Sequence, residues 1–84
     1  YNAKIIYESL CIAKKMIKTH DFDKIKDFIN NLFLLDKKFH LEYFYIVEST
    51  SLKEVTSFNP DVKIRAFICA RFQKTRLIDN SPLN

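Results

Sequence analysis

The chain has 84 residues, of which 48% are hydrophobic and 29% charged, and its net charge is +4. This length limits it to one small domain, residues 1–84, and the aromatic and aliphatic content argues against disorder. The absence of glycine excludes glycine-rich phosphate loops and the dinucleotide fingerprint. No apolar run approaches the roughly 18 residues of a membrane span. The positive charge permits contacts with nucleic acid or phosphate without requiring them.

Two helices are predicted first. Residues 3–18 carry apolar side chains at helical spacing, namely Ala3, Ile6, Leu10, Ala13 and Ile17. We expect the side chain of Asp21 to cap a second helix by accepting backbone N–H groups. That helix has an apolar face formed by Phe22, Ile25, Phe28, Ile29, Leu32 and Phe33, and the pattern breaks at residues 36–40. The short link between the helices favours an antiparallel pair.

Three strands follow. From Leu41 the period is two, with Leu41, Tyr43, Tyr45 and Val47 on one face and Glu42, Phe44, Ile46 and Glu48 on the other. Since both faces are mostly apolar, we expect this strand to be central or covered on both sides. After a polar connection at 49–61, residues 62–72 alternate as a second strand. Gln73-Lys74 then turns the chain into a third strand, Thr75–Asn80, and Pro82 should lie after that strand.

These elements predict an α+β fold, in which two antiparallel helices pack on a three-stranded antiparallel sheet. Because the chain opens at Tyr1 in an already helical pattern, we expect it to be part of a longer protein. We expect a cytoplasmic location, since no signal peptide is visible.

The segment "RLIDN" at 76–80 holds a cation, a carboxylate and an amide. Alternation places Arg76 and Asp79 on opposite faces, so they do not point at a common substrate. One interpretation is that Asp79 and Asn80 fasten the strand end through hydrogen bonds to the backbone. The other is that these residues contact a ligand directly.

A basic set occupies the last two strands and comprises Lys63, Arg65, Arg71, Lys74 and Arg76. Phe67 lies between the basic residues of the second strand, and such a surface can bind phosphates or stack a base. The alternative is a solvent-facing sheet surface that charge keeps from associating.

Other side chains give weaker signals. His20 and His40 have no convergent cysteine or carboxylate cluster, so we predict no metal site. Glu42 and Glu48 should share a face about 20 Å apart, which is too far for a paired-carboxylate mechanism. Cys11 and Cys69 are expected to be reduced and buried. We therefore assign no catalytic, substrate-binding, cofactor-binding or metal residue to this chain.

The later half of the chain resembles the C-terminal domain of the pantoate–β-alanine ligase (pantothenate synthetase) family. The residues that carry the resemblance are "LEYFYIVE" at 41–48, the Ser51-Leu52 pair, the strand around Ala66 and, most specifically, "TRLIDN" at 75–80. The family usually has glycine just before the Thr-Arg, where this chain has Gln73. Because a positive φ would strain Gln73, we expect a different turn type here.

The resemblance implies part of an ATP-dependent, AMP-forming ligase that uses Mg²⁺ and joins pantoate to β-alanine, inactive without its N-terminal Rossmann-like catalytic domain. That domain would be the partner of this one, which would act as a hinged cover, and the whole enzyme would be a homodimer. None of the family's catalytic motifs occurs in these 84 residues. We expect Arg65, Arg71 or Arg76 to face the cleft and attract the phosphates of ATP.

Two other classes remain open. The charge and the Arg-Phe-Arg strand face would also suit a small basic RNA- or phosphate-binding module, although we do not expect nucleic acid to be the partner. The Phe-rich helices could instead offer a surface to another protein.

Overall fold

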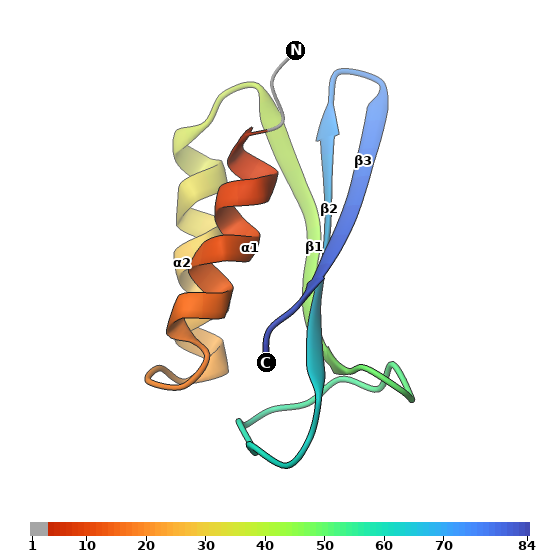
Figure 1. Ribbon diagram of the computed structural model, residues 1–84. Coiled ribbons are helices and arrows are strands. Elements are labelled where there is room, and N and C mark those ends of the chain that lie inside the picture. The colour runs from red at the N-terminus through yellow and green to blue at the C-terminus, as the bar shows by residue number, and fades with distance from the viewer. Residues whose placement is uncertain (1–3) are drawn as a thin grey trace.

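The computed structural model describes residues 4–84, which form two helices and three strands in the order α1, α2, β1, β2, β3. The bounds are Lys4–Met16 for α1, Phe22–Leu35 for α2, Phe39–Glu48 for β1, Ile64–Phe72 for β2 and Thr75–Pro82 for β3. Both helices lie side by side on one face of the sheet and run in opposite directions (Figure 1). The predicted α+β fold is confirmed.

The helices begin and end close to their predicted bounds. Ala3, where the first helix was expected to start, lies outside the described residues. The α1 helix ends at Met16, whose carbonyl accepts hydrogen bonds from the N–H groups of Thr19 and His20. Asp21 precedes α2 as predicted, but its side chain makes no capping hydrogen bond, so that expectation is wrong. Only its backbone carbonyl contributes, accepting from Ile25 N at 3.1 Å.

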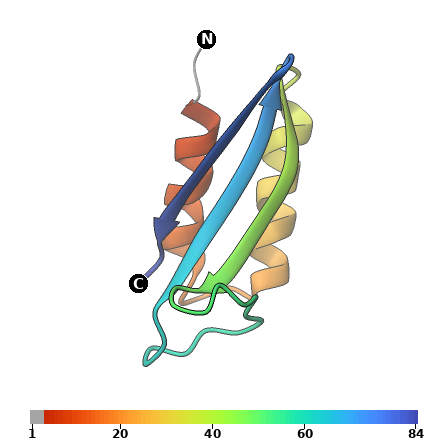
Figure 2. The same ribbon diagram turned by 90° about the vertical axis from the view of Figure 1, so that its right-hand side faces the viewer.

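The sheet is antiparallel with strand order β1-β2-β3, so β2 is its central strand. Of the two arrangements expected for the first strand, the central position is therefore wrong. Residues 53–55 fold back along the outer edge of β1, where Glu48 N donates to Lys53 O and Val55 N donates to Ile46 O. Figure 2 shows β1 and β3 on either side of β2, with both helices behind the sheet.

An irregularity in β1 changes its alternation. The pairing with β2 shifts between Leu41 and Tyr43, so that an extra residue, Glu42, is accommodated in β1. Leu41 and Phe44 consequently both pack on the helix side, whereas strict alternation placed them on opposite faces. The shift also means that Glu42 and Glu48 do not share a face, which corrects the prediction. A bulge of this kind re-aims a side chain at the cost of one ladder position.

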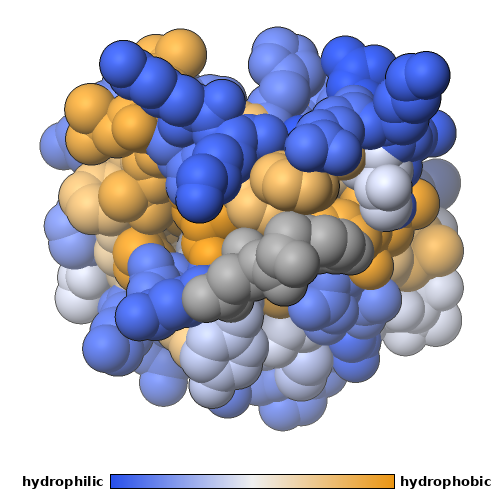
Figure 3. All heavy atoms as spheres, turned by 90° about the horizontal axis from the view of Figure 1, so that it is seen from above, coloured by the Kyte–Doolittle hydropathy of each residue, from blue (hydrophilic) through white to orange (hydrophobic). Residues whose placement is uncertain are grey.

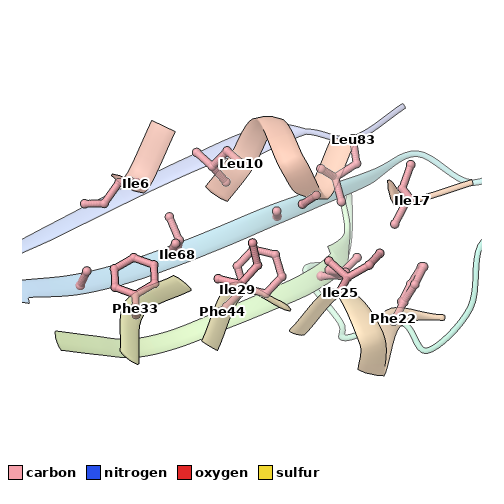
Figure 4. Close-up of a cluster of buried hydrophobic side chains, with 14 of the residues drawn as sticks. Ile6, Leu10, Ile17, Phe22, Ile25, Ile29, Phe33, Phe44, Ile68 and Leu83 are labelled. Atoms are coloured by element: carbon pink, nitrogen blue, oxygen red, sulfur yellow. The ribbon is translucent and has the colours of Figure 1, made fainter. Parts of the chain in front are cut away.

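The core fills the space between the helices and the sheet. Its members include Ile6 and Leu10 of α1, Ile25 and Ile29 of α2, and strand residues such as Phe44 and Ile68. Figure 4 shows these side chains pointing toward one another from both layers. Of the predicted apolar face of α2, only Phe28 is exposed. Viewed from the end that holds the 73–74 turn, hydrophobic residues form a band between hydrophilic ones (Figure 3).

The C-terminal segment closes the fold. Pro82 is the last residue of β3 and not a residue beyond it, and an edge strand tolerates a proline there because one side of it has no ladder partner. Leu83 is buried at 2% exposure, and its N–H donates to Ile64 O. The side chain of Asn84 accepts from Ile64 N at 2.9 Å and donates to Val62 O at 2.8 Å.

The β2–β3 turn contains Gln73 with φ at 56°, in the left-handed region. The expectation that the turn would avoid a positive φ is therefore wrong. The two-residue loop joins the directly paired residues Phe72 and Thr75, and short hairpin loops require a positive φ to match strand twist. The geometry of the hairpin outweighs the steric preference of glutamine at this position.

Candidate functional site

The sheet has one face that the helices leave uncovered, which we call the outer face. Alternation and strand pairing place its residues as follows: His40, Glu42, Tyr43, Tyr45 and Val47 on β1, Arg65, Phe67, Cys69 and Arg71 on β2, and Arg76, Ile78 and Asn80 on β3. Figure 2 views the sheet from this side. Most of the candidate functional side chains that the sequence analysis named lie on this face.

An ionic cluster occupies one end of the outer face. Glu42 Oε2 accepts a hydrogen bond from Arg76 Nε at 2.7 Å, and Glu42 Oε1 lies 3.7 Å from Arg71 Nη1. The Cys69 thiol lies beneath this pair, 3.4 Å from Glu42 Oε2 and 3.6 Å from Arg76 Nη2. One carboxylate thus holds two arginines from two different strands.

The contacts shift the protonation equilibria of the cluster. The hydrogen bond from Cys69 and the contacts with Arg76 and Arg71 lower the pKa of Glu42, against the opposing effect of burial. Burial, and then the hydrogen bond with Glu42, raises the pKa of Cys69, so the thiol stays protonated at neutral pH. A protonated buried thiol is a poor nucleophile, and the cluster is therefore suited to electrostatic work and not to covalent catalysis.

An apolar depression lies beside the ionic cluster. It is lined by Tyr43, Tyr45, Val47, Leu52 and Phe67. The rings of Tyr43 and Tyr45 stack with centroids 5.1 Å apart, and Tyr45 is 47% exposed. Leu52 approaches from the connection after β1 with φ at 62° and is 57% exposed. Two tyrosines, a phenylalanine and a leucine next to paired charges are a composition typical of protein interfaces.

The structure separates the other candidates. Arg65 Nη1 donates to Asn80 Oδ1, so Asn80 contacts a side chain and not the backbone. Asp79 Oδ1 accepts from the N–H of Asn80 at 2.8 Å, which confirms a side-chain-to-backbone bond for Asp79. Asp79 lies on the helix side of the sheet, beside Tyr7 and Cys11, and not with Arg76. Asn84 also fastens the C-terminal end of the chain to the start of β2.

The remaining polar residues do not converge. Within residues 4–84, no three His, Cys, Asp or Glu side chains are close enough to share a metal ion. Thr19 Oγ1 lies 2.8 Å from His20 Nδ1, whereas His40 is on the outer face. Cys69 is buried as expected, but Cys11 is only half-buried, and both thiols are free. Neither helix in this part of the chain has the length and apolarity needed to span a membrane.

Comparison with known proteins identifies the family. The family model described as pantoate-beta-alanine ligase matches residues 1–82. The chain belongs to this family. Pantothenate synthetase of Christiangramia forsetii is 37% identical over 82 residues, and that of Flavobacterium psychrophilum is 33% identical over 81 residues. These alignments cover 98% and 96% of the chain, but only 29% of each relative's length.

A solved structure of a family member shares the fold. The crystal structure of pantothenate synthetase from Thermus thermophilus superposes with a TM-score of 0.80 over 96% of this chain, at 20% sequence identity. The match again covers 29% of the longer chain. The two helices and the three-stranded antiparallel sheet correspond to the C-terminal domain of the pantoate–β-alanine ligase family.

Sequence reasoning missed the role of Glu42. The alternation of the strand placed Glu42 with Phe44 and Glu48, because a bulge leaves no signal in a single sequence. The only hint is that Glu42 is an acidic residue inside a strand, while Arg71 and Arg76 lie in the strands that follow. Register is needed to see that one carboxylate reaches both arginines.

Proposed function

We propose that this chain is the C-terminal domain of an ATP-dependent, AMP-forming ligase that joins pantoate to β-alanine, and that it covers the active site of an N-terminal Rossmann-like domain. The single observation that carries this proposal is the outer face. It is left bare by both helices, yet it holds a tyrosine-rich depression and three arginines, Arg65, Arg71 and Arg76. A sheet that the chain itself does not cover on this side is suited to pack against another part of a longer protein.

A cover of this kind would have a chemical purpose. In the proposed reaction the carboxylate of pantoate attacks the α-phosphate of ATP, which forms pantoyl adenylate and releases pyrophosphate. The amine of β-alanine then attacks the acyl carbon and displaces AMP. Water can attack the same carbon and return pantoate and AMP, so a cover that excludes water favours the amine.

The proposal also assigns the binding of ATP and Mg²⁺ to one part of the enzyme. We propose that ATP and Mg²⁺ bind the N-terminal domain, with catalysis located there and this domain inactive alone. The complete enzyme is proposed to be a cytoplasmic homodimer.

The complete ligase, compared with a variant that lacks residues 1–84 of this chain, tests the covering role. AMP and pantothenate are quantified together while β-alanine is kept near its KM. The intact enzyme should form about one AMP per pantothenate, and the deleted variant should form an excess of AMP through hydrolysis. An unchanged ratio at an unchanged rate would mean that the domain does not protect the adenylate.

The arginines supply a second test on the same enzyme. Single replacements Arg65→Gln, Arg71→Gln and Arg76→Gln should raise the apparent KM for ATP or slow closure if these side chains face the cleft. Lys15→Gln on the far side of α1 is the matched charge control, because Lys15 is exposed on the helix layer. Unchanged kinetics in all three arginine variants would remove the arginines from the proposed role.

An RNA- or phosphate-binding module is the alternative from another class, and the cationic outer face is the observation that favours it. Salt-dependent retention of the chain on RNA at physiological ionic strength would support that alternative. Absence of binding, together with an excess of AMP after deletion, would favour the covering role.

A further inference from the structure

A row of basic side chains crosses all three strands of the outer face. His40 of β1 is paired directly with Arg71 of β2, and Arg71 is paired directly with Arg76 of β3. The three side chains therefore project from one line perpendicular to the strands, and all three are exposed.

The row carries an electrostatic conflict that one residue relieves. Like charges directly opposite each other across an antiparallel pair are destabilising. Glu42 lies between Arg71 and Arg76 with one carboxylate oxygen toward each, at 3.7 Å and 2.7 Å. The bulge in β1 allows this carboxylate to reach the outer face. A structural irregularity thus supplies an anion where the row needs one.

We propose that Arg71, Arg76 and His40 form a binding site for the phosphate groups of a small polyphosphate, with Glu42 as the resident counter-ion that offsets the repulsion between the two guanidinium groups when no ligand is bound. Glu42 then competes with the ligand for the arginines, and the arginines are the groups that contact the ligand.

Exposure and geometry support a ligand on the solvent side. The side chain of Glu42 is 21% exposed, whereas those of Arg71 and Arg76 are 48% and 57% exposed. The carboxylate therefore lies deeper in the cluster than the two arginine side chains, which are open to solvent over about half of their surface. Planar guanidinium groups bind phosphate oxygens through paired hydrogen bonds, which lysine cannot do.

Charge count favours an anion over a neutral ligand. The two arginines and Glu42 sum to +1, and Lys74 in the adjoining turn adds a further positive charge. Arg65 is not part of the site, because it pairs with Pro82 in register, far from the 73–74 turn, and it donates to Asn80. A compact ligand with several negative charges matches this short row better than a long polyanion.

The site deepens the proposed function, since a phosphate group bound here would belong to the nucleotide or to pyrophosphate in the covered active site. It is nevertheless testable on the 84-residue chain alone. If the domain does not cover the active site, the chain can still bind phosphate. If the chain does not bind phosphate, the excess of AMP expected after deletion of the domain is unaffected, so the two failures can be told apart.

Binding of inorganic pyrophosphate is measured by two-dimensional NMR titration at constant ionic strength. The unmodified chain should show shifts confined to residues around positions 40, 71 and 76. The double variant Arg71→Gln/Arg76→Gln should weaken binding about tenfold or more, while the control Lys15→Gln/Lys24→Gln on the helices should change it less than about twofold. Equal affinities in both double variants would overturn the proposal.

Glu42→Gln tests the counter-ion role. Removing the resident negative charge should tighten pyrophosphate binding by about three- to tenfold, because the ligand no longer competes with the carboxylate. It should also enlarge the increase in Tm that pyrophosphate produces. Weaker binding by a folded Glu42→Gln variant would overturn the counter-ion role, and if this variant does not fold, the arginine variants decide.

The class of ligand is tested with a single-stranded RNA oligonucleotide at the same phosphate concentration as pyrophosphate. If the RNA binds more tightly than pyrophosphate, and this binding depends on Arg71, the assignment to a small anion is overturned.

Discussion

Two neighbouring aromatic residues of β1 should respond very differently to truncation. Phe44 is 8% exposed and packs under the helices, whereas Tyr45 is 47% exposed on the outer face. Replacing a buried phenylalanine with alanine costs about 3–5 kcal/mol, since it removes apolar burial and leaves a cavity. Truncating Tyr45 removes mainly its stack on Tyr43, which is worth about 1 kcal/mol.

The difference is large on the scale of the whole domain. A chain of this length has an unfolding free energy of about 4–12 kcal/mol, so Phe44→Ala removes a large part of it. Each kcal/mol corresponds to about 4–8 °C in Tm for a domain of this size. Urea denaturation of the unmodified chain and of each variant, followed by circular dichroism, gives the loss in unfolding free energy for Phe44→Ala and for Tyr45→Ala. Equal losses for Phe44→Ala and Tyr45→Ala would refute the assignment of Phe44 to the helix side and of Tyr45 to the outer face.

Three further predictions concern single positions. Gln73→Gly should raise Tm by about 2–8 °C, because relief of a strained positive φ exceeds the entropic cost of glycine; a lower Tm in thermal denaturation would contradict this. The pKa of Glu42 is lowered by Cys69, Arg76 and Arg71, so its contribution to stability is present above its unfolded pKa of about 4.3 and is lost as pH falls through the folded pKa. Glu42→Gln should therefore flatten the acid limb of the stability curve, and an unchanged limb would argue against the ion pairs. The pKa of Cys69 is raised by burial and by Glu42, so stability is present below about pH 8.5 and is lost as pH rises through the folded pKa. Urea denaturation from pH 8 to 10 should show a shallower decline for Cys69→Ala than for the unmodified chain, and identical declines would place the thiol in water.

The layer arrangement could be predicted because helical and strand periods are local properties of the sequence. The apolar spacing of Ile6 to Ile17 predicts a helix with one buried face, and the alternation of Ile64 to Phe72 predicts a strand with one buried face. The resemblance of "TRLIDN" at 75–80 then predicted the family, which the comparisons confirm.

Other features depend on contacts between distant residues and could not be predicted. The bulge at Glu42 and the edge position of β1 depend on how the strands pair with one another. The alternation of residues within one strand carries no information about that pairing. The apolar outer side of β1 suggested a covered central strand, whereas the structure shows Tyr43 and Tyr45 beside an open depression. An apolar face that this chain does not cover is what a domain of a longer protein would present, and we propose that its partner lies outside these 84 residues.

Labelling of single cysteines in the complete ligase tests most directly whether the outer face meets the active site. In a Cys11→Ser background, in which Cys69 stays buried, Tyr45→Cys reports on the outer face and Asn31→Cys reports on the exposed side of α2. The rate of maleimide labelling is compared with and without ATP and pantoate. The covering role predicts that substrates slow labelling at position 45 and leave position 31 unchanged. Protection at position 31 with none at position 45 would place the helices against the active site and contradict the account.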